Sequence, residues 1–252
     1  MFAAAAAAAA ASSHSAMAAD LPAKAGPMAA PVPSWEGLYV GGSIGASWLN
    51  SVGDDSGNGF ALPSGYGTIP GGQRTTSTAV GGIGGLDIGY NWQDRNFVYG
   101  LEADISWLAN AKATSTGHLG TSAYYAASKT SRVNDLATFR GRFGFDFDGT
   151  MPYVTFGIAE GQIKNSYRFT ASGYGGGLSS FSSHTSFQPG VVLGGGIEHA
   201  FTNHWTLRGE LLWIGFKTDS FSPAGPAGYA STGAVAFTNS LVLGRIGLNY
   251  KF

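Results

Sequence analysis

Charged residues of both signs recur at alternate positions of predicted strands, and they are the side chains of this sequence best suited to chemistry. The acids are Asp87, Glu102, Asp104, Asp146, Glu198 and Glu210, and the bases are Arg140, Arg142, Arg208, Arg245 and Lys251. Buried charges are tolerated when they are paired and hydrogen-bonded, and the guanidinium of arginine can donate to a carboxylate at two positions. We expect these groups to pair between neighbouring strands: Glu102 and Asp104 with Arg140 and Arg142, and Arg208 and Glu210 with Arg245.

The segments that carry these charges have the period of two that is typical of half-buried strands. In Phe97–Leu108, for example, Leu101 and Ile105 lie on one face, and Glu102 and Asp104 lie on the other. Eight such segments are predicted: Trp35–Trp48, Ala79–Trp92, Phe97–Leu108, Val133–Phe147, Pro152–Ile163, Phe187–Phe201, Trp205–Lys217 and Phe237–Phe252.

The connections between the predicted strands alternate regularly in length. Gln93–Asn96, Asp148–Met151 and Thr202–His204 are tight turns, whereas Leu49–Thr78, Ala109–Arg132, Lys164–Ser186 and Thr218–Ala236 are long. Short turns at one end and long loops at the other are typical of outer-membrane barrels. The sequence therefore predicts an all-β fold: an eight-stranded antiparallel up-and-down transmembrane β-barrel with short periplasmic turns and long extracellular loops.

Alternation alone does not say which face of the strands points inward. A soluble barrel has apolar residues inside, whereas a membrane barrel has them outside. The apolar faces here begin and end on aromatic residues, as in Phe97 with Trp107 and Trp205 with Trp213, which is typical of interfacial girdles. The polar faces are rich in Gly, Ser and Thr, which suit a narrow lumen. We therefore predict a bacterial outer-membrane location with the charges inside.

Two functions are open for the predicted lumen charges. They can form a structural ion network that fills and closes the lumen, or they can form a selectivity filter or ligand site. Eight strands leave room for little more than side chains, which favours the structural network. Its predicted members are Asp87, Glu102, Asp104, Arg140, Arg142, Asp146, Glu198, Arg208, Glu210 and Arg245.

Composition narrows the function further. The net charge of −1 over 252 residues argues against a nucleic-acid partner. The sequence has no Cys, which removes disulfides, thiolate metal sites and cysteine catalysis. Its five His residues are scattered, although His118 and His184 fall in long loops where a metal or haem ligand pair could form. No nucleophile–base–acid arrangement stands out on a strand face. We predict no catalytic residue, no metal site, no cofactor and no enzymatic activity.

The N-terminal region is predicted to contain a signal peptide, which is cleaved off, followed by an extended linker. Residues 1–18 are alanine-rich, and the small residues Ala16 and Ala18 fit a signal-peptidase site. This signal peptide is atypical, because no Lys or Arg precedes Asp20. Residues 19–34 carry several prolines and are predicted to be a linker, so that the barrel domain spans residues 35–252.

The last strand, Phe237–Phe252, ends on aromatic residues, with Tyr250 and Phe252 in the apolar phase. It resembles the C-terminal strand that barrel assembly machinery reads in outer-membrane proteins. We therefore expect Tyr250 and Phe252 to form an assembly signal, and outer-membrane lipid and that machinery to be partners.

Five segments carry a resemblance to a known family: Ala19–Pro22, Trp35–Gly42, Arg140–Gly144, Pro152–Val154 and the final strand. Through them the chain from Trp35 onward resembles the porin-family outer-membrane immunogenic surface proteins of alphaproteobacteria. The resemblance implies a monomeric Gram-negative surface barrel that contributes to envelope integrity and surface contact through its loops. The alternative is a narrow porin or a loop-based ligand-binding protein, with haem as the ligand that the resemblance suggests for some relatives.

Overall fold

A computed structural model describes residues 34–61, 68–119, 124–172, 177–226 and 230–252. The expected signal peptide, 1–18, and all of the expected linker except Ser34 lie outside these residues. No helix within the described ranges is long and apolar enough to cross a membrane.

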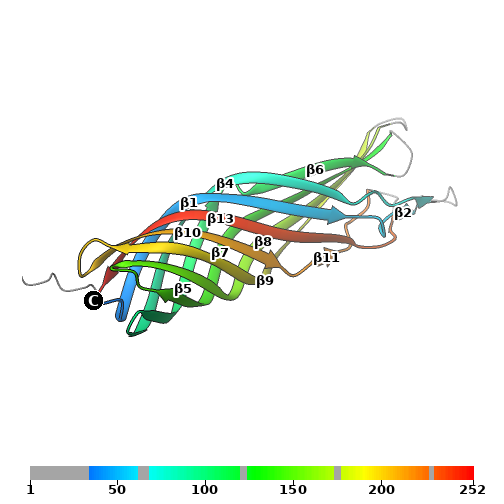
Figure 1. The fold of residues 1–252 in the computed structure, drawn as a ribbon. Helices are drawn as coiled ribbons and strands as arrows, with labels where there is room; N and C mark the ends of the chain where they lie inside the picture. Colours follow the sequence, from blue (N-terminus) through cyan, green and yellow to red (C-terminus); the bar gives the residue numbers. More distant parts are fainter. Residues whose placement is uncertain (1–33, 62–67, 120–123, 173–176, 227–229) are drawn as a thin grey trace, which may run out of the picture. The chain divides into compact units, whose positions relative to one another are not determined.

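Eight long strands form one antiparallel sheet, and Figure 1 shows them following one another around a ring. The strands are β1 (Gly37–Asp54), β4 (Thr75–Asp94), β5 (Phe97–Ala109), β7 (Tyr125–Phe145), β8 (Thr150–Ala171), β9 (Leu178–Ala200), β10 (Trp205–Phe216) and β13 (Val235–Lys251). The first and last strands pair from Tyr39 with Lys251 to Asp54 with Ala236. This pairing closes the sheet, and it confirms the predicted eight-stranded antiparallel barrel.

Shorter strands extend the barrel at the end with the long loops. β6 (Lys112–His118) continues the line of β5 and pairs with β7, and β11 (Asp219–Phe221) pairs with β13. Between β5 and β6, Asn110 has a positive φ of 62°, a conformation that Asn tolerates better than most residues. A separate small sheet contains β2 (Phe60–Ala61), β3 (Thr68–Ile69) and β12 (Ala230–Ser231).

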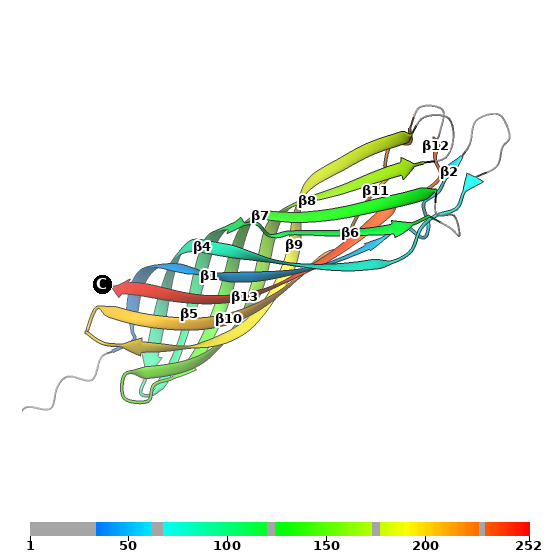
Figure 2. The ribbon, with the colours of Figure 1, turned by 90° about the horizontal axis from the view of Figure 1, so that it is seen from above.

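The predicted strands are too short at their extracellular ends. β8 continues to Ala171 and β9 begins at Leu178, so most of the predicted loop Lys164–Ser186 is strand. Figure 2 shows β6, β7, β8 and β9 continuing beyond the ring as an extension of the sheet. The Ser- and Thr-rich composition of these segments hides the strands, whereas a continuous backbone ladder supports them.

The outer wall of the barrel is apolar, as the sequence predicts. Ile44 is 74% exposed and Leu211 is 65% exposed, and outward-facing Trp, Phe, Leu and Val side chains surround them on every long strand. These exposed apolar residues form a belt, which we call the membrane belt, between the short turns and the sheet extension. Alternate residues of the same strands point inward and are buried.

The interior is built in layers, and it is less uniformly polar than the sequence predicts. Along β5, inward-facing Val98 is followed by Glu102 and Asp104 and then by Leu108. Leu108 belongs to an apolar cluster inside the barrel that also includes Leu212 and Ile214. A second apolar cluster fills the extracellular end: Phe60, Ile69, Leu119, Ala127, Tyr167, Phe169, Ala171, Val235 and Phe237.

Candidate functional site: the charged lumen

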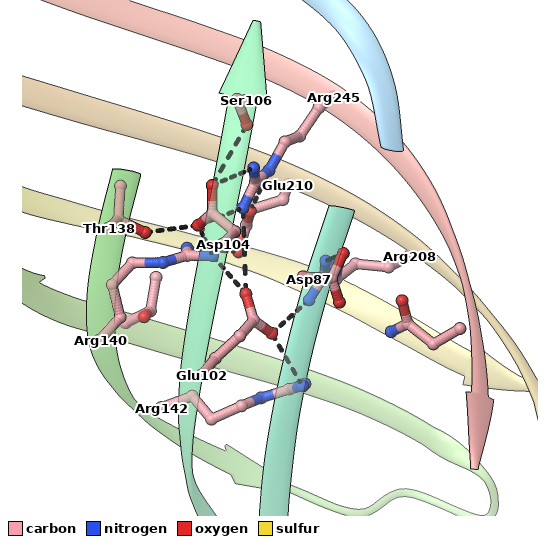
Figure 3. Close-up of polar contacts among 12 residues, drawn as sticks. Asp87, Glu102, Asp104, Ser106, Thr138, Arg140, Arg142, Arg208, Glu210 and Arg245 are labelled. Carbon is pink, nitrogen blue, oxygen red and sulfur yellow. Dashed lines mark hydrogen bonds and ion pairs between the residues drawn. The ribbon is translucent and has the colours of Figure 1, made fainter. Parts of the chain in front are cut away.

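The strand register brings the predicted acids and bases into one buried layer inside the barrel. Glu102 lies opposite Arg140 on neighbouring strands β5 and β7, and Glu210 lies opposite Arg245 on β10 and β13. Because these residues are in the inward phase of their strands, their side chains meet inside the ring. Figure 3 shows this layer, which we call the lumen network. Its charged members are Asp87, Glu102, Asp104, Arg140, Arg142, Glu198, Arg208, Glu210 and Arg245.

Arg140 lies at the centre of the lumen network, where three carboxylates surround it (Figure 3). Its guanidinium donates to Glu102, to Asp104 Oδ2 at 3.0 Å and to Glu210 Oε1 at 3.0 Å. The side chain is only 1% exposed. A guanidinium with five donors is well suited to this position, because a single ammonium cannot present donors in a fixed planar fork.

Two further arginines each reach across the lumen to at least one strand that is not their neighbour. Arg208 on β10 donates to Glu102 at 2.5 Å and to Asp87 at 2.8 Å. Arg245 on β13 donates through Nε to Glu210 at 2.6 Å and through Nη1 to Asp104 at 3.2 Å. These contacts tie the wall of the barrel together through its centre as well as around its circumference.

Two tyrosines that sequence reasoning did not place also belong to the lumen network. The Tyr39 hydroxyl donates to Glu102 at 2.6 Å and accepts from Arg142 at 3.1 Å. The Tyr153 hydroxyl donates to Glu210 at 2.9 Å, and the Arg142 guanidinium lies 4.3 Å from the centre of the Tyr153 ring. The signal in the sequence for these contacts is that both tyrosines lie in the inward phase of their strands.

Neutral donors add hydrogen bonds to two of the carboxylates, Glu198 and Asp104. Glu198 accepts from Arg142 at 2.5 Å, from Thr206 at 2.5 Å and from Asn249 at 2.8 Å. Thr138 donates to Asp104 in the same way. These contacts matter because buried charges need hydrogen bonds as well as opposite charges to offset their loss of water.

The prediction that Asp146 joins the network needs correction. Asp146 is buried, but its Oδ1 accepts a hydrogen bond from the backbone N–H of Gly149 at 3.0 Å. No ion pair joins it to another described residue. The strand ends at Phe145 and the chain turns sharply through Asp148 and Gly149, which both have positive φ. Asp146 therefore stabilises a periplasmic turn.

A second buried ion pair, which the sequence did not predict, lies at the extracellular end. Lys129 on β7 donates to Asp55 Oδ1 at 2.6 Å, to the carbonyl of Gly53 at 3.3 Å and to that of Gln73 at 2.5 Å. Tyr167 on β8 donates to the other oxygen of Asp55 at 3.3 Å. Burial, followed by the charge of Asp55, raises the pKa of the Tyr167 hydroxyl. This cluster anchors the segment after β1 to the sheet extension.

The expected assembly-signal residues lie at the periplasmic end, beside the barrel seam. The Tyr250 ring contacts Trp205 and Phe252 edge to face, with ring centres 5.0 and 5.3 Å apart. Phe252 is 67% exposed, and its backbone N–H donates to the carbonyl of Leu38 at 3.0 Å. The final aromatic ring is therefore accessible on the outside of the seam.

The two loop histidines do not come together. Lys112 on β6 shares a cross-strand row with Thr185 on β9, through β7 and β8. His118 is six residues from Lys112 and lies on the same face, whereas His184 is the neighbour of Thr185 and lies on the opposite face. Within the described ranges, no group of three or more His, Cys, Asp or Glu side chains is arranged to hold a metal ion.

Comparisons with known proteins agree on the family. The family described as "Outer membrane protein beta-barrel domain" matches residues 2–252. The 31 kDa outer-membrane immunogenic protein of Brucella melitensis is 32% identical over 248 residues, covering 94% of each chain. The 22 kDa outer membrane protein of Rhizobium leguminosarum bv. viciae is 28% identical, covering 76% of this chain and 69% of its own.

Among solved structures, the chain is similar to the outer membrane protease OmpT from Escherichia coli. It is 10% identical, with a TM-score of 0.46, over 86% of this chain and 97% of its own. The match of the family over nearly the whole sequence, together with the immunogenic relatives, shows that this chain belongs to the outer-membrane β-barrel family of Gram-negative surface proteins.

Proposed function

We propose that this protein is a structural and surface-interaction barrel of the outer membrane, whose lumen is closed by the lumen network. In this function the barrel contributes to envelope integrity by anchoring an extracellular extension firmly in the membrane. The proposal includes no catalytic step, and it is supported by relatives that are named as outer-membrane immunogenic proteins. The expected partners are outer-membrane lipid, the assembly machinery and an extracellular ligand of the loops, and we expect the barrel to be a monomer.

The observation that carries this proposal is the ion pair between Arg208 and Glu102. Arg208 is on β10 and Glu102 is on β5, and these strands lie four places apart in the closed order of eight. They therefore face each other across the ring, so a contact of 2.5 Å between their side chains crosses the lumen completely. The apolar cluster around Leu212 and Ile214 follows on the extracellular side of this contact.

Ion conductance in a planar bilayer tests the closed lumen directly. We expect the refolded wild-type barrel to give no steady single-channel current above the bilayer baseline. Each preparation must show the heat-modifiable gel shift of a folded barrel, so that the absence of current from misfolded protein is not mistaken for a closed lumen. A steady, ion-selective current from the folded protein would refute the closed lumen and support the narrow porin instead.

Titration with haem, followed by absorbance, tests the loop-ligand alternative in the same preparation. Because His118 and His184 lie on opposite faces of the sheet extension, we expect no saturable haem complex that depends on both residues. Saturable binding that disappears in both His118→Ala and His184→Ala would contradict this expectation.

A further inference from the structure

A basic pocket lies on the outward face of the sheet extension, beyond the membrane belt. Its volume is about 430 Å³, and β6, β7, β8 and β9 contribute to its lining. Its exposed cations are Lys112, Arg132, Lys164 and Arg168, and Phe181 forms part of its wall. The pocket faces away from the barrel interior, because Lys129 and Tyr167 on the same strands point to the other side.

Three of these cations form a row across adjacent strands. Lys112 is directly opposite Arg132, and Arg132 is directly opposite Lys164. Like charges in directly opposite positions of antiparallel strands destabilise the sheet. No ion pair joins any of the three to a carboxylate among the residues that the structure describes. The row is therefore an uncompensated concentration of positive charge.

The fourth cation and the aromatic ring give the pocket a second feature. The Arg168 guanidinium lies 5.1 Å from the centre of the Phe181 ring, and the two residues are cross-strand partners. The outward carboxylates of β7 and β8 that come nearest in sequence are Asp135 and Glu160. Asp135 follows Arg132 by three residues and Glu160 precedes Lys164 by four, so both lie on the membrane side of the row. Neither lines the pocket, and the charged side chains that line it are all cations.

The position of the row relative to the membrane belt identifies the kind of ligand. On β9 the exposed belt residue Phe187 lies opposite Gln162 of β8, which is two residues before Lys164 on the same face. At about 3.3 Å per residue, Lys164 lies roughly 7 Å along the strand beyond the level of this ring. The row therefore lies just outside the hydrocarbon, on the wall that outer-leaflet lipids surround, at the level of their headgroups and sugars.

We propose that this pocket binds the phosphorylated sugar headgroup of an outer-leaflet glycolipid, lipopolysaccharide. Phosphate oxygens would accept charge-assisted hydrogen bonds from Lys112 and Lys164, and Arg132 between them can bind a phosphate in a bidentate manner. A sugar ring can pack against Phe181. The bound phosphates neutralise the row of like charges, so ligand binding and sheet stability are coupled.

This inference rests on the proposed function, because it names the lipid partner through which the barrel would support envelope integrity. The two remain separable in experiment. Lipid binding is measured at the outward face of the extension, and a conducting barrel can bind lipid equally well.

The probe is lipid A that carries two phosphates and two acidic sugars, added to the folded full-length barrel in non-ionic detergent. Bound lipid is counted by native mass spectrometry. We expect Lys112→Gln/Lys164→Gln to bind at least about tenfold more weakly than the wild type, because two charge-assisted contacts are lost. The matched control, Arg74→Gln/Lys217→Gln, removes the same charge from exposed positions outside the pocket and should bind like the wild type.

A dephosphorylated form of the same lipid and soluble heparin fragments complete the binding test. Loss of the phosphates should weaken wild-type binding and leave the Lys112→Gln/Lys164→Gln variant almost unchanged. Equal binding of the phosphorylated lipid by the wild type and this variant would overturn the proposal. So would a pocket-dependent preference for heparin over the lipid, which would assign the pocket to a soluble polyanion.

A stability measurement gives a second, independent outcome. Without anionic lipid, Arg132→Gln should raise the melting temperature, because it relieves repulsion from both neighbours. With saturating phosphorylated lipid the order should reverse, and the wild type should melt at the higher temperature. A variant that is less stable than the wild type under both conditions would contradict the proposal that a bound anion neutralises the like charges of the row.

Discussion

Replacing Arg140 by alanine is the most direct test of the lumen network. The guanidinium contacts Glu102, Asp104 and Glu210, and no solvent is available to these groups because each is almost fully buried. Removing one partner of a buried ion pair typically costs about 3–5 kcal/mol, since the remaining charge stays buried without compensation. We expect Arg140→Ala to lose about this much free energy of unfolding.

Urea unfolding of the refolded barrel measures this loss. With a slope of about 2–3 kcal/mol per M of urea, the unfolding midpoint should fall by about 1–2 M. The control Arg74→Ala removes an exposed arginine and should change the free energy of unfolding by no more than about 0.5 kcal/mol. An unchanged slope would show that the variant unfolds from the same folded state.

A double-mutant cycle with Glu102→Gln tests whether the loss comes from this contact. We expect a coupling free energy of about 1–3 kcal/mol between Arg140 and Glu102. Rescue should be partial, because Glu102 also accepts from Arg208 and Tyr39. A loss below about 1 kcal/mol for Arg140→Ala, combined with altered ion selectivity in a wild type that conducts, would refute the structural role and support a filter.

Three further predictions test other parts of the molecule. Tyr39→Phe should lower the free energy of unfolding by about 1–3 kcal/mol in the same urea assay, because Glu102 and Arg142 both lose a partner; no change would exclude a role for this hydroxyl in the network. Lys129→Ala should speed protease cleavage near Asp55 while the barrel keeps its gel shift, because the segment after β1 loses its anchor; unchanged cleavage would contradict that anchoring. Deletion of Phe252 should reduce the folded fraction in membranes, measured by the gel shift, if this ring is part of the assembly signal, whereas equal yield would contradict that role.

Strand phase was enough to predict that charges in the middle of a strand, such as Glu102 and Asp104, face the lumen. Glu102 and Asp104 alternate with exposed Leu101 and Ile105 in both sequence and structure. The contact from Arg208 to Glu102 could not be predicted in the same way, because it depends on how the closed sheet staggers its opposite strands. Alternation shows which face of a strand a residue lies on. It does not show whether two residues 106 apart in sequence, such as Glu102 and Arg208, lie at the same height along the barrel axis.

The interior apolar cluster was missed for a related reason. In β10 the run Leu211-Leu212-Trp213-Ile214 is apolar on both faces, so the period of two disappears where the lumen changes from charged to apolar. The inward tyrosines were hidden because Tyr also occurs in the outward girdles. Asp146 was misplaced because phase alone does not show where a tight turn ends the strand.

The seam between β1 and β13 has a consequence for how the protein folds. Its register joins residues that lie far apart in the sequence, such as Tyr39 and Lys251, so it is a contact of very high sequence separation. Contacts of this kind form slowly, because the intervening chain must be ordered first. Until the seam forms, β1 and β13 each present an unpaired edge that can add a strand from another molecule. Export therefore exposes the chain to aggregation for as long as its two ends remain apart, and barrel closure ends that hazard at both edges in one step.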